Sequence, residues 1–170
     1  MVLGMSPSVF TLFHVVLSLA GILTGCVVVF GMFASKCPTG WTAIFLAATV
    51  LTSLTGFLFP FDHLLPSHLV GIVSMIVLCA AVLALYVFRL AGSWRWIYLA
   101  GAVSAFYLNV FVLVAQAFAK LSFLHQMAPT QTEPPFAIAQ GVVFAIFVTL
   151  FINVFHSFHP GANAAASSPA

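Results

Sequence analysis

VFTLFHVVLSLAGILTGCVVVFGMFA, from Val9 to Ala34, contains no charged residue and exceeds the roughly 20 apolar residues of a membrane-spanning helix. Similar stretches run from about Trp41 to Phe59, Ser67 to Leu90, Trp94 to Leu121 and Phe136 to Phe155. Only 4% of the 170 residues are charged and 64% are hydrophobic, whereas soluble domains carry about 25% charged residues. The sequence therefore predicts an all-α polytopic membrane protein, a bundle of five transmembrane helices.

The breaks between these stretches contain helix-stopping residues, such as Pro60 and Pro66. No polar stretch is long enough for a soluble domain, so residues 1–160 are expected to form a single transmembrane domain. The first helix is expected to be retained and not cleaved as a signal peptide. Thr132 is a predicted N-cap of the last helix. The small and polar residues 161–170 predict a disordered cytoplasmic tail.

The few charges predict the orientation of the bundle. Lys36, Arg89 and Arg95 fall on one side of the apolar stretches, whereas Lys120 is the lone cation on the other side. Cytoplasmic loops of membrane proteins carry an excess of Lys and Arg. The pattern therefore predicts an outward N-terminus and a cytoplasmic C-terminus.

Ionisable side chains gather on the predicted outward side. They are His14, Asp62, His63, His68, His125 and Glu133. Ionisable side chains are costly in a bilayer and are often functional there. Histidine and carboxylate side chains are suitable ligands for zinc, copper or iron. Three interpretations stay open: a transition-metal site, a haem held by His14 and His68, or histidines that merely bond helix ends near the headgroups.

The fourth stretch carries the most polar residues of the predicted interior. Asn109, Gln116 and Lys120 fall on one helical face, and Gln140 lies at the depth expected of a partner for Gln116. Such a row of amides could line a pocket for a small molecule or a quinone-like ligand. The alternative is simple hydrogen bonding between helices, which is worth about 0.6 kcal/mol for each bond.

Stripes of small residues predict which helix faces meet, because close backbone approach favours association in lipid. Two such stripes are His14, Ser18, Gly21 and Gly25 in the first helix and Gly141, Ala145, Thr149 and Asn153 in the fifth. Both stripes are predicted to face the bundle interior. The Gly21–Gly25 pair has the G-x-x-x-G spacing of helix dimers, but packing within the bundle is the preferred interpretation.

Four segments carry a resemblance: Thr55–Gly71 (TGFLFPFDHLLPSHLVG), Trp94–Tyr98 (WRWIY), Tyr107–Lys120 (YLNVFVLVAQAFAK) and Ala128–Phe136 (APTQTEPPF). Together they resemble a group of small, uncharacterised inner-membrane proteins of bacteria. The resemblance implies a bacterial inner-membrane location and assigns no catalytic residue.

These observations predict an integral inner-membrane protein with a polar His/Asp/Glu site at its outward face. The expected ligand is a metal, a haem or a quinone-like molecule. The alternative is a non-enzymatic accessory or scaffold subunit that packs against a membrane-protein partner or another copy of itself. The sequence shows no catalytic or transport signature and nothing that favours nucleic acid as a partner, so a non-enzymatic role is favoured.

Overall fold

The computed structural model describes residues 4–59 and 66–159, with Pro66 and Ser67 described by their backbone only. Its long helices are α1 (Pro7–Phe33), α2 (Thr39–Gly56), α3 (Pro66–Val82), α4 (Trp94–Lys120) and α6 (Pro134–Ser157). A π-helical turn, η1 (Leu83–Val87), continues α3, and a short α5 (Ser122–Met127) follows α4. Five helices of the described chain are long and apolar enough to cross a membrane, which confirms the predicted all-α, multi-pass bundle.

The third span ends differently from the prediction. It was expected to run as one helix to Leu90, but the α-helix gives way to the π-turn at Leu83, where Phe88 N donates to the Leu83 carbonyl. Arg89 and Leu90 then take positive φ angles of 48° and 60°, which end the helix. A π-turn holds one residue more per turn than an α-helix, and such turns are frequent at functional sites.

The connection between the last two spans also differs from the prediction. It contains α5, and the residue at the N-cap of α6 is Glu133, not Thr132. The Thr132 hydroxyl is paired with that of Thr130, at 2.6 Å, and so does not cap the helix. Pro134 occupies the first turn of α6, where a missing backbone donor costs nothing.

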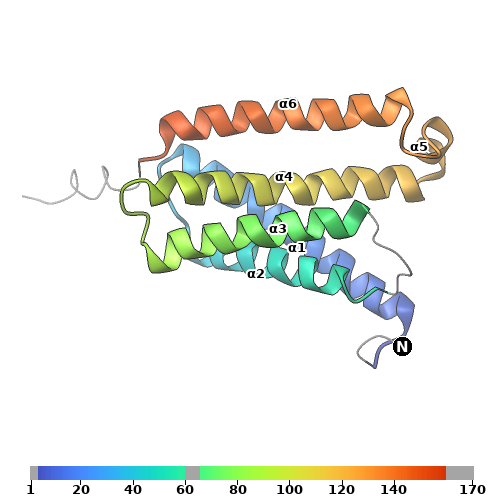
Figure 1. Ribbon diagram of the computed structural model, residues 1–170, viewed down its shortest axis with the longest axis horizontal. Helices are drawn as coiled ribbons and strands as arrows, with labels where there is room; N and C mark the ends of the chain where they lie inside the picture. The colour runs from blue at the N-terminus through green and yellow to red at the C-terminus, as the bar shows by residue number, and fades with distance from the viewer. Residues whose placement is uncertain (1–3, 60–65, 160–170) are drawn as a thin grey trace, which may run out of the picture.

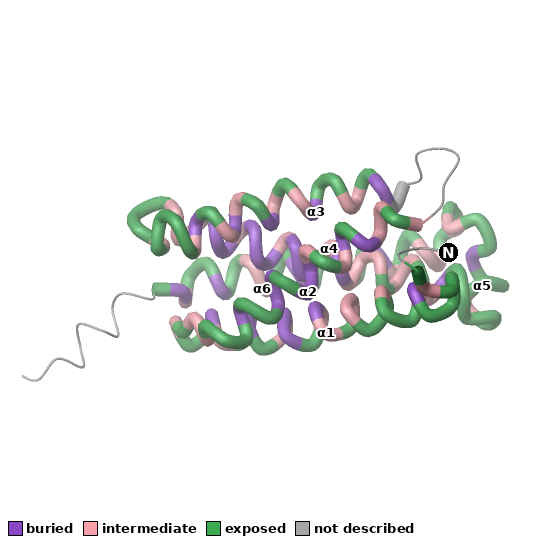
Figure 2. The backbone as a smooth tube through the Cα atoms, turned by 90° about the horizontal axis from the view of Figure 1, so that it is seen from below, coloured by how far each residue is buried: buried purple, intermediate pink, exposed green. Residues whose placement is uncertain are grey.

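Helix α4 is the centre of the bundle. It contacts α1, α2, α3 and α6, and its buried residues include Tyr98, Leu99, Ala102 and Phe106. Figure 1 shows the long helices side by side, with α6 lying along one side of α4. In Figure 2 the buried positions follow the inner faces of the helices, whereas much of α3 and α6 is exposed to the surroundings. An exposed apolar surface of this kind suits lipid.

The G-x-x-x-G pair of α1 faces the interior, as predicted. A Cβ added at Gly25 would lie only 2.7 Å from Phe106 Cδ2 and 3.1 Å from Phe45 Cε2. A Cβ at Gly21 would lie 3.1 Å from Thr49 Oγ1 and 3.2 Å from Asn109 Nδ2. The two glycines therefore let α2 and α4 pack closely against α1 within one chain.

The small-residue stripe of α6 faces away from the bundle, so this prediction was wrong. Its members are all exposed: Gly141, Ala145, Thr149 and Asn153. Helix α6 instead packs through Phe147 and Val154, and the Phe147 ring lies 5.0 Å from that of Phe106. Thr149 and Asn153 bond to carbonyls of their own helix, so neither needs a partner in the interior.

The charged residues that the sequence places on opposite sides of the apolar stretches lie at opposite ends of the bundle. Ser35 Oγ donates to the Ser157 carbonyl at 2.5 Å, which ties the loop before α2 to the end of α6. The turn between η1 and α4 lies at this same end, and α5 and the start of α1 lie at the other (Figure 1). We call the first end inner and the second outer, following the predicted orientation.

Candidate functional site

A hydrogen bond between His14 and Thr55 forms the centre of the outer end. His14 lies in the second turn of α1 and Thr55 in the last turn of α2, and His14 Nδ1 is 2.7 Å from Thr55 Oγ1. Thr55 is buried and His14 is half-buried. The close packing of α1 against α2 brings them together.

The neighbouring hydrogen bonds determine the tautomer of His14. The Thr55 hydroxyl donates its proton to the Leu51 carbonyl at 2.7 Å, one turn earlier in α2. With its proton on that carbonyl, Thr55 Oγ1 accepts from His14, so we assign the imidazole proton to Nδ1. His14 Nε2 then carries a lone pair, and it has no hydrogen-bond partner among the described residues. This atom can coordinate a metal or accept a hydrogen bond from a ligand.

Aromatic rings lie beside both His14 and His68 at this end. The Phe59 ring lies 5.3 Å from the His14 ring, edge to face, and 5.0 Å from Phe10. His68, in the first turn of α3, is buried, with its ring 5.8 Å from that of Phe57. Asp62 and His63, which were predicted to complete the site, lie outside the described residues.

The remaining predicted ligands do not join His14 in the described structure. His125 is exposed on α5. The Glu133 carboxylate accepts hydrogen bonds from Thr130 and Thr132. Burial acts to raise the pKa of Glu133, but these hydrogen bonds outweigh it and lower the pKa. Within residues 4–59 and 66–159, no three His, Cys, Asp or Glu side chains lie close enough together to hold a metal ion.

The predicted row of amides does not form. Asn109 is buried, but its Nδ2 donates to Thr49 Oγ1 at 3.0 Å, next to Gly21. Gln116 is exposed, and Gln140 Nε2 donates instead to the Phe111 carbonyl at 3.0 Å. The expected pairing of Gln116 with Gln140 is therefore wrong. The cause is that Gln140 reaches a main-chain oxygen of α4 directly, on a face that Gln116 does not share.

Hydroxyl groups of α2 were missed as partners of the polar residues. Besides the contacts of Thr49 and Thr55, Ser53 Oγ donates to Ser74 Oγ of α3 at 3.2 Å. The available signal was the number of Thr and Ser residues along this otherwise apolar span. Hydroxyls in membrane helices commonly bond their own backbone, so sequence alone does not reveal which of them also serve a neighbour.

Comparison of the chain with family models, with curated proteins and with solved structures gives no match.

Proposed function

We propose that this chain is a multi-pass protein of the bacterial inner membrane that binds a transition-metal ion at its outward end. His14 Nε2 is a ligand, and His68, buried in the first turn of α3 at the same end, is a candidate second ligand. Asp62 and His63 are the further ligands that the sequence predicts.

The hydrogen bond from His14 to Thr55 supports this proposal most directly. Histidines that bind metals usually donate their other ring N–H to a fixed acceptor, which sets the tautomer and orients the ring. Thr55 is such an acceptor because the Leu51 carbonyl already binds its proton. The Phe59 ring beside His14 further restricts the imidazole. The pair thus holds one imidazole nitrogen lone pair in a fixed orientation near the outer end.

Metal content tests the proposal. The protein is purified in mild detergent, loaded with zinc or copper, and analysed by elemental analysis and absorption spectroscopy. We expect a stoichiometric metal in the wild type, loss of it in His14→Ala, and affinity about 10- to 100-fold weaker in Thr55→Val. His156→Ala is the matched control because His156 is exposed at the opposite end.

Full metal content in His14→Ala would contradict the proposal, as would a wild type that binds neither zinc nor copper. A Soret band would instead assign the lone pair to haem iron. A melting temperature of His14→Ala close to that of the wild type shows that any loss of metal is not a loss of folding.

A second candidate function rests on the outward stripe of α6. Gly141, Ala145, Thr149 and Asn153 form an exposed row of small and polar side chains, the composition of contacts between membrane helices. This row favours an accessory subunit that packs α6 against a helix of a larger membrane complex.

Co-purification in mild detergent tests this second function. Gly141→Leu should release the partner, whereas Val142→Leu, on a neighbouring exposed position, should retain it. Recovery of the wild type as a lone monomer would count against it. Gly21 and Gly25 are unsuitable for this test because they pack inside the bundle.

A further inference from the structure

The cations at the inner end have no acidic side chain to pair with. Lys36, Arg89 and Arg95 lie at this end. Glu133 is the only acidic side chain in the described part of the chain, and it lies at the N-cap of α6, at the outer end. The inner end is therefore a surface of unpaired positive charge, which favours an anionic partner.

Contacts with aromatic rings fix the position of Arg95. Its guanidinium carbon lies 4.1 Å from the centre of the Trp96 ring, which is the distance of a cation–π contact. The Trp96 ring stacks in turn on Phe155 of α6, with ring centres 4.1 Å apart and planes 28° from parallel. Arg95 and Trp96 are both half-buried, so the guanidinium is held where the start of α4 meets the end of α6.

The loop before α2 reaches the same place. The His159 ring stands edge-on to the Trp96 ring, with centres 6.2 Å apart, and the His159 backbone N–H donates to Ser35 Oγ at 3.1 Å. Ser35 has a positive φ of 53° after the end of α1, where glycine is usual. Glycine has no hydroxyl, whereas the Ser35 hydroxyl joins this loop to the end of α6. The backbone of Lys36, the next residue, is therefore held close to α6.

We call Lys36, Arg95, Trp96 and His159 the inner cluster. The Arg95 guanidinium makes no hydrogen bond within the described residues, although its side chain is half-buried. Lys36 and His159 are exposed. Arg and Lys are charged N–H donors and a histidine ring offers a further N–H, so the cluster has donors for phosphate oxygens.

An apolar surface continues from the inner cluster along α6 toward the middle of the bundle. Phe155 is exposed, and Phe151, one turn earlier, is half-buried with its ring centre 6.1 Å from that of Phe155. Ile152, between them in sequence, is also exposed. Phosphate donors at the end of a membrane helix, followed by an apolar face, match the headgroup and acyl chains of a phospholipid. Basic pockets between membrane helices bind lipid headgroups in this way.

We propose that the inner cluster binds one anionic phospholipid, with Arg95 and Lys36 on its phosphate and Phe155 against an acyl chain. A zwitterionic lipid suits the cluster less well, because its ammonium group would find no acidic side chain at this end in the described chain. This site is independent of the metal site at the outer end.

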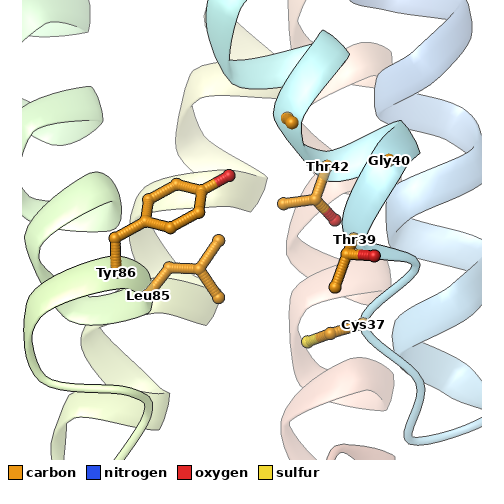
Figure 3. Close-up of a pocket in the computed structure, with 7 residues that line it drawn as sticks. Cys37, Thr39, Gly40, Thr42, Leu85 and Tyr86 are labelled. Carbon is orange, nitrogen blue, oxygen red and sulfur yellow. The ribbon is translucent and has the colours of Figure 1, made fainter.

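A cavity of about 500 Å³ at the same end is a less suitable place for such a lipid. Figure 3 shows the cavity between the start of α2, with Thr42, and the end of the third span, with Tyr86. No charged side chain of the described residues lines it, so a phosphate would find no cation there. Ala43, an exposed residue of its lining, offers a way to fill it.

Native mass spectrometry of the purified, delipidated protein in mild detergent tests the proposal. The probes are dioleoyl phosphatidylglycerol and dioleoyl phosphatidylcholine, which have the same acyl chains. We expect one phosphatidylglycerol to bind with about tenfold preference over phosphatidylcholine. Arg95→Gln and Lys36→Gln should each weaken its binding about fivefold, the usual effect of one basic side chain at an anionic surface. Arg95→Lys, which keeps the charge, should restore part of the affinity.

Arg89→Gln is the matched control for charge. Arg89 is an exposed arginine of the same end, but it follows η1, and Figure 1 shows the third span and α6 on opposite sides of α4. Its replacement should leave the affinity for phosphatidylglycerol unchanged. Ala43→Phe, which fills the cavity, should also leave it unchanged.

Four results would overturn the proposal. Equal affinity for the two lipids would remove the role of charge. Equal losses in Arg89→Gln and Arg95→Gln would indicate diffuse surface charge and not a built site. Loss of binding in Ala43→Phe would place the lipid in the cavity. Full competition by millimolar inorganic phosphate would make a free anion the ligand. If Arg95→Gln melts lower than the wild type, Lys36→Gln decides, and wild-type affinity in that variant would equally refute the proposal.

Discussion

At the scale of single residues, the two ends of α2 differ in how a threonine hydroxyl is hydrogen-bonded. At Thr55 the proton goes to the Leu51 carbonyl, so the oxygen is an acceptor and presents His14 as a base. The Thr42 hydroxyl makes no such bond to the carbonyl four residues earlier; it is buried and lies beside the Tyr98 hydroxyl. The outer end therefore offers a nitrogen lone pair, whereas the Thr42 hydroxyl is enclosed within the bundle.

The hydrogen bonds of Glu133 should make the stability of the segment between α5 and α6 depend on pH. Its carboxylate accepts from Thr130 N at 3.2 Å, Thr130 Oγ1 at 2.9 Å and Thr132 N at 3.1 Å. Despite an opposing effect of burial, these bonds lower its pKa below the ordinary 4.5. Because the folded pKa is the lower one, the stabilisation is present above pH 4.5 and is lost as the pH falls through the lowered value.

Hydrogen exchange of the Thr130 and Thr132 amides checks this prediction. After correction for intrinsic rates, their protection should fall between pH 6 and pH 3, whereas that of the Ala128 amide, bonded to the Leu124 carbonyl, should not. In Glu133→Gln, the Thr130 and Thr132 amides should be as weakly protected at pH 6 and at pH 3 as those of the wild type are at pH 3. Equal protection of the wild type at the two pH values would refute it.

Individual residues were predictable from sequence only as far as their depth in the membrane. Residue types and positions put His14 near the start of the first span and Asn109 in the interior, and the structure agrees. They did not reveal that Thr55 and Thr49 are the partners, since pairing depends on which faces of α1, α2 and α4 meet. The buried contact between Thr42 and Tyr98 could not be predicted either, because both residue types are ordinary in apolar helices.

At the scale of helices, glycine positions distinguish packed faces from free ones. A Cβ at Gly101 of α4 would lie 2.9 Å from both Ala81 Cβ and the Val77 carbonyl oxygen of α3, closer than atoms of this kind approach. A Cβ at Gly141 of α6 would meet nothing within 4 Å. Replacement of glycine by alanine should therefore affect stability in opposite directions at these two positions.

Gly101→Ala should destabilise the bundle by about 1–3 kcal/mol, because α3 and α4 must separate to admit the methyl group. Gly141→Ala should be neutral or slightly stabilising, since alanine is the better helix former. Thermal unfolding in detergent measures both. A Gly101→Ala protein that melts as high as Gly141→Ala would show that α3 and α4 do not pack as described.

The five spans could be predicted from sequence because their lengths and hydropathy are strong signals. Two local features could not be predicted. The π-turn at Leu83–Val87 and the outward stripe of α6 both depend on tertiary contacts. Small residues indicate that a face permits close approach, but aromatic residues such as Phe147 determined which face of α6 meets α4.

At the scale of the whole molecule, the bundle has two chemically different ends. Lys36, Arg89 and Arg95 belong to the inner end, where Arg95 lies 4.1 Å from the centre of the Trp96 ring. The outer end holds His14, His68 and Glu133. The number of spans and the separation of charges followed from composition. The position of α4 at the centre did not, because its mean hydropathy of 2.0 lies between that of α2, 1.2, and those of the other spans.

The unequal lengths of the helices have a consequence for the surrounding bilayer. At 1.5 Å per residue, the 27 residues of α1 and of α4 span about 40 Å, whereas the 18 residues of α2 span about 27 Å. The hydrocarbon layer is about 30 Å thick, so the long helices must tilt or protrude while α2 falls short. Lipids beside α2 would adapt by local thinning, which brings headgroups and water toward both of its ends. Thr55, hydrogen-bonded to His14 in the proposed metal site, lies near one of those ends.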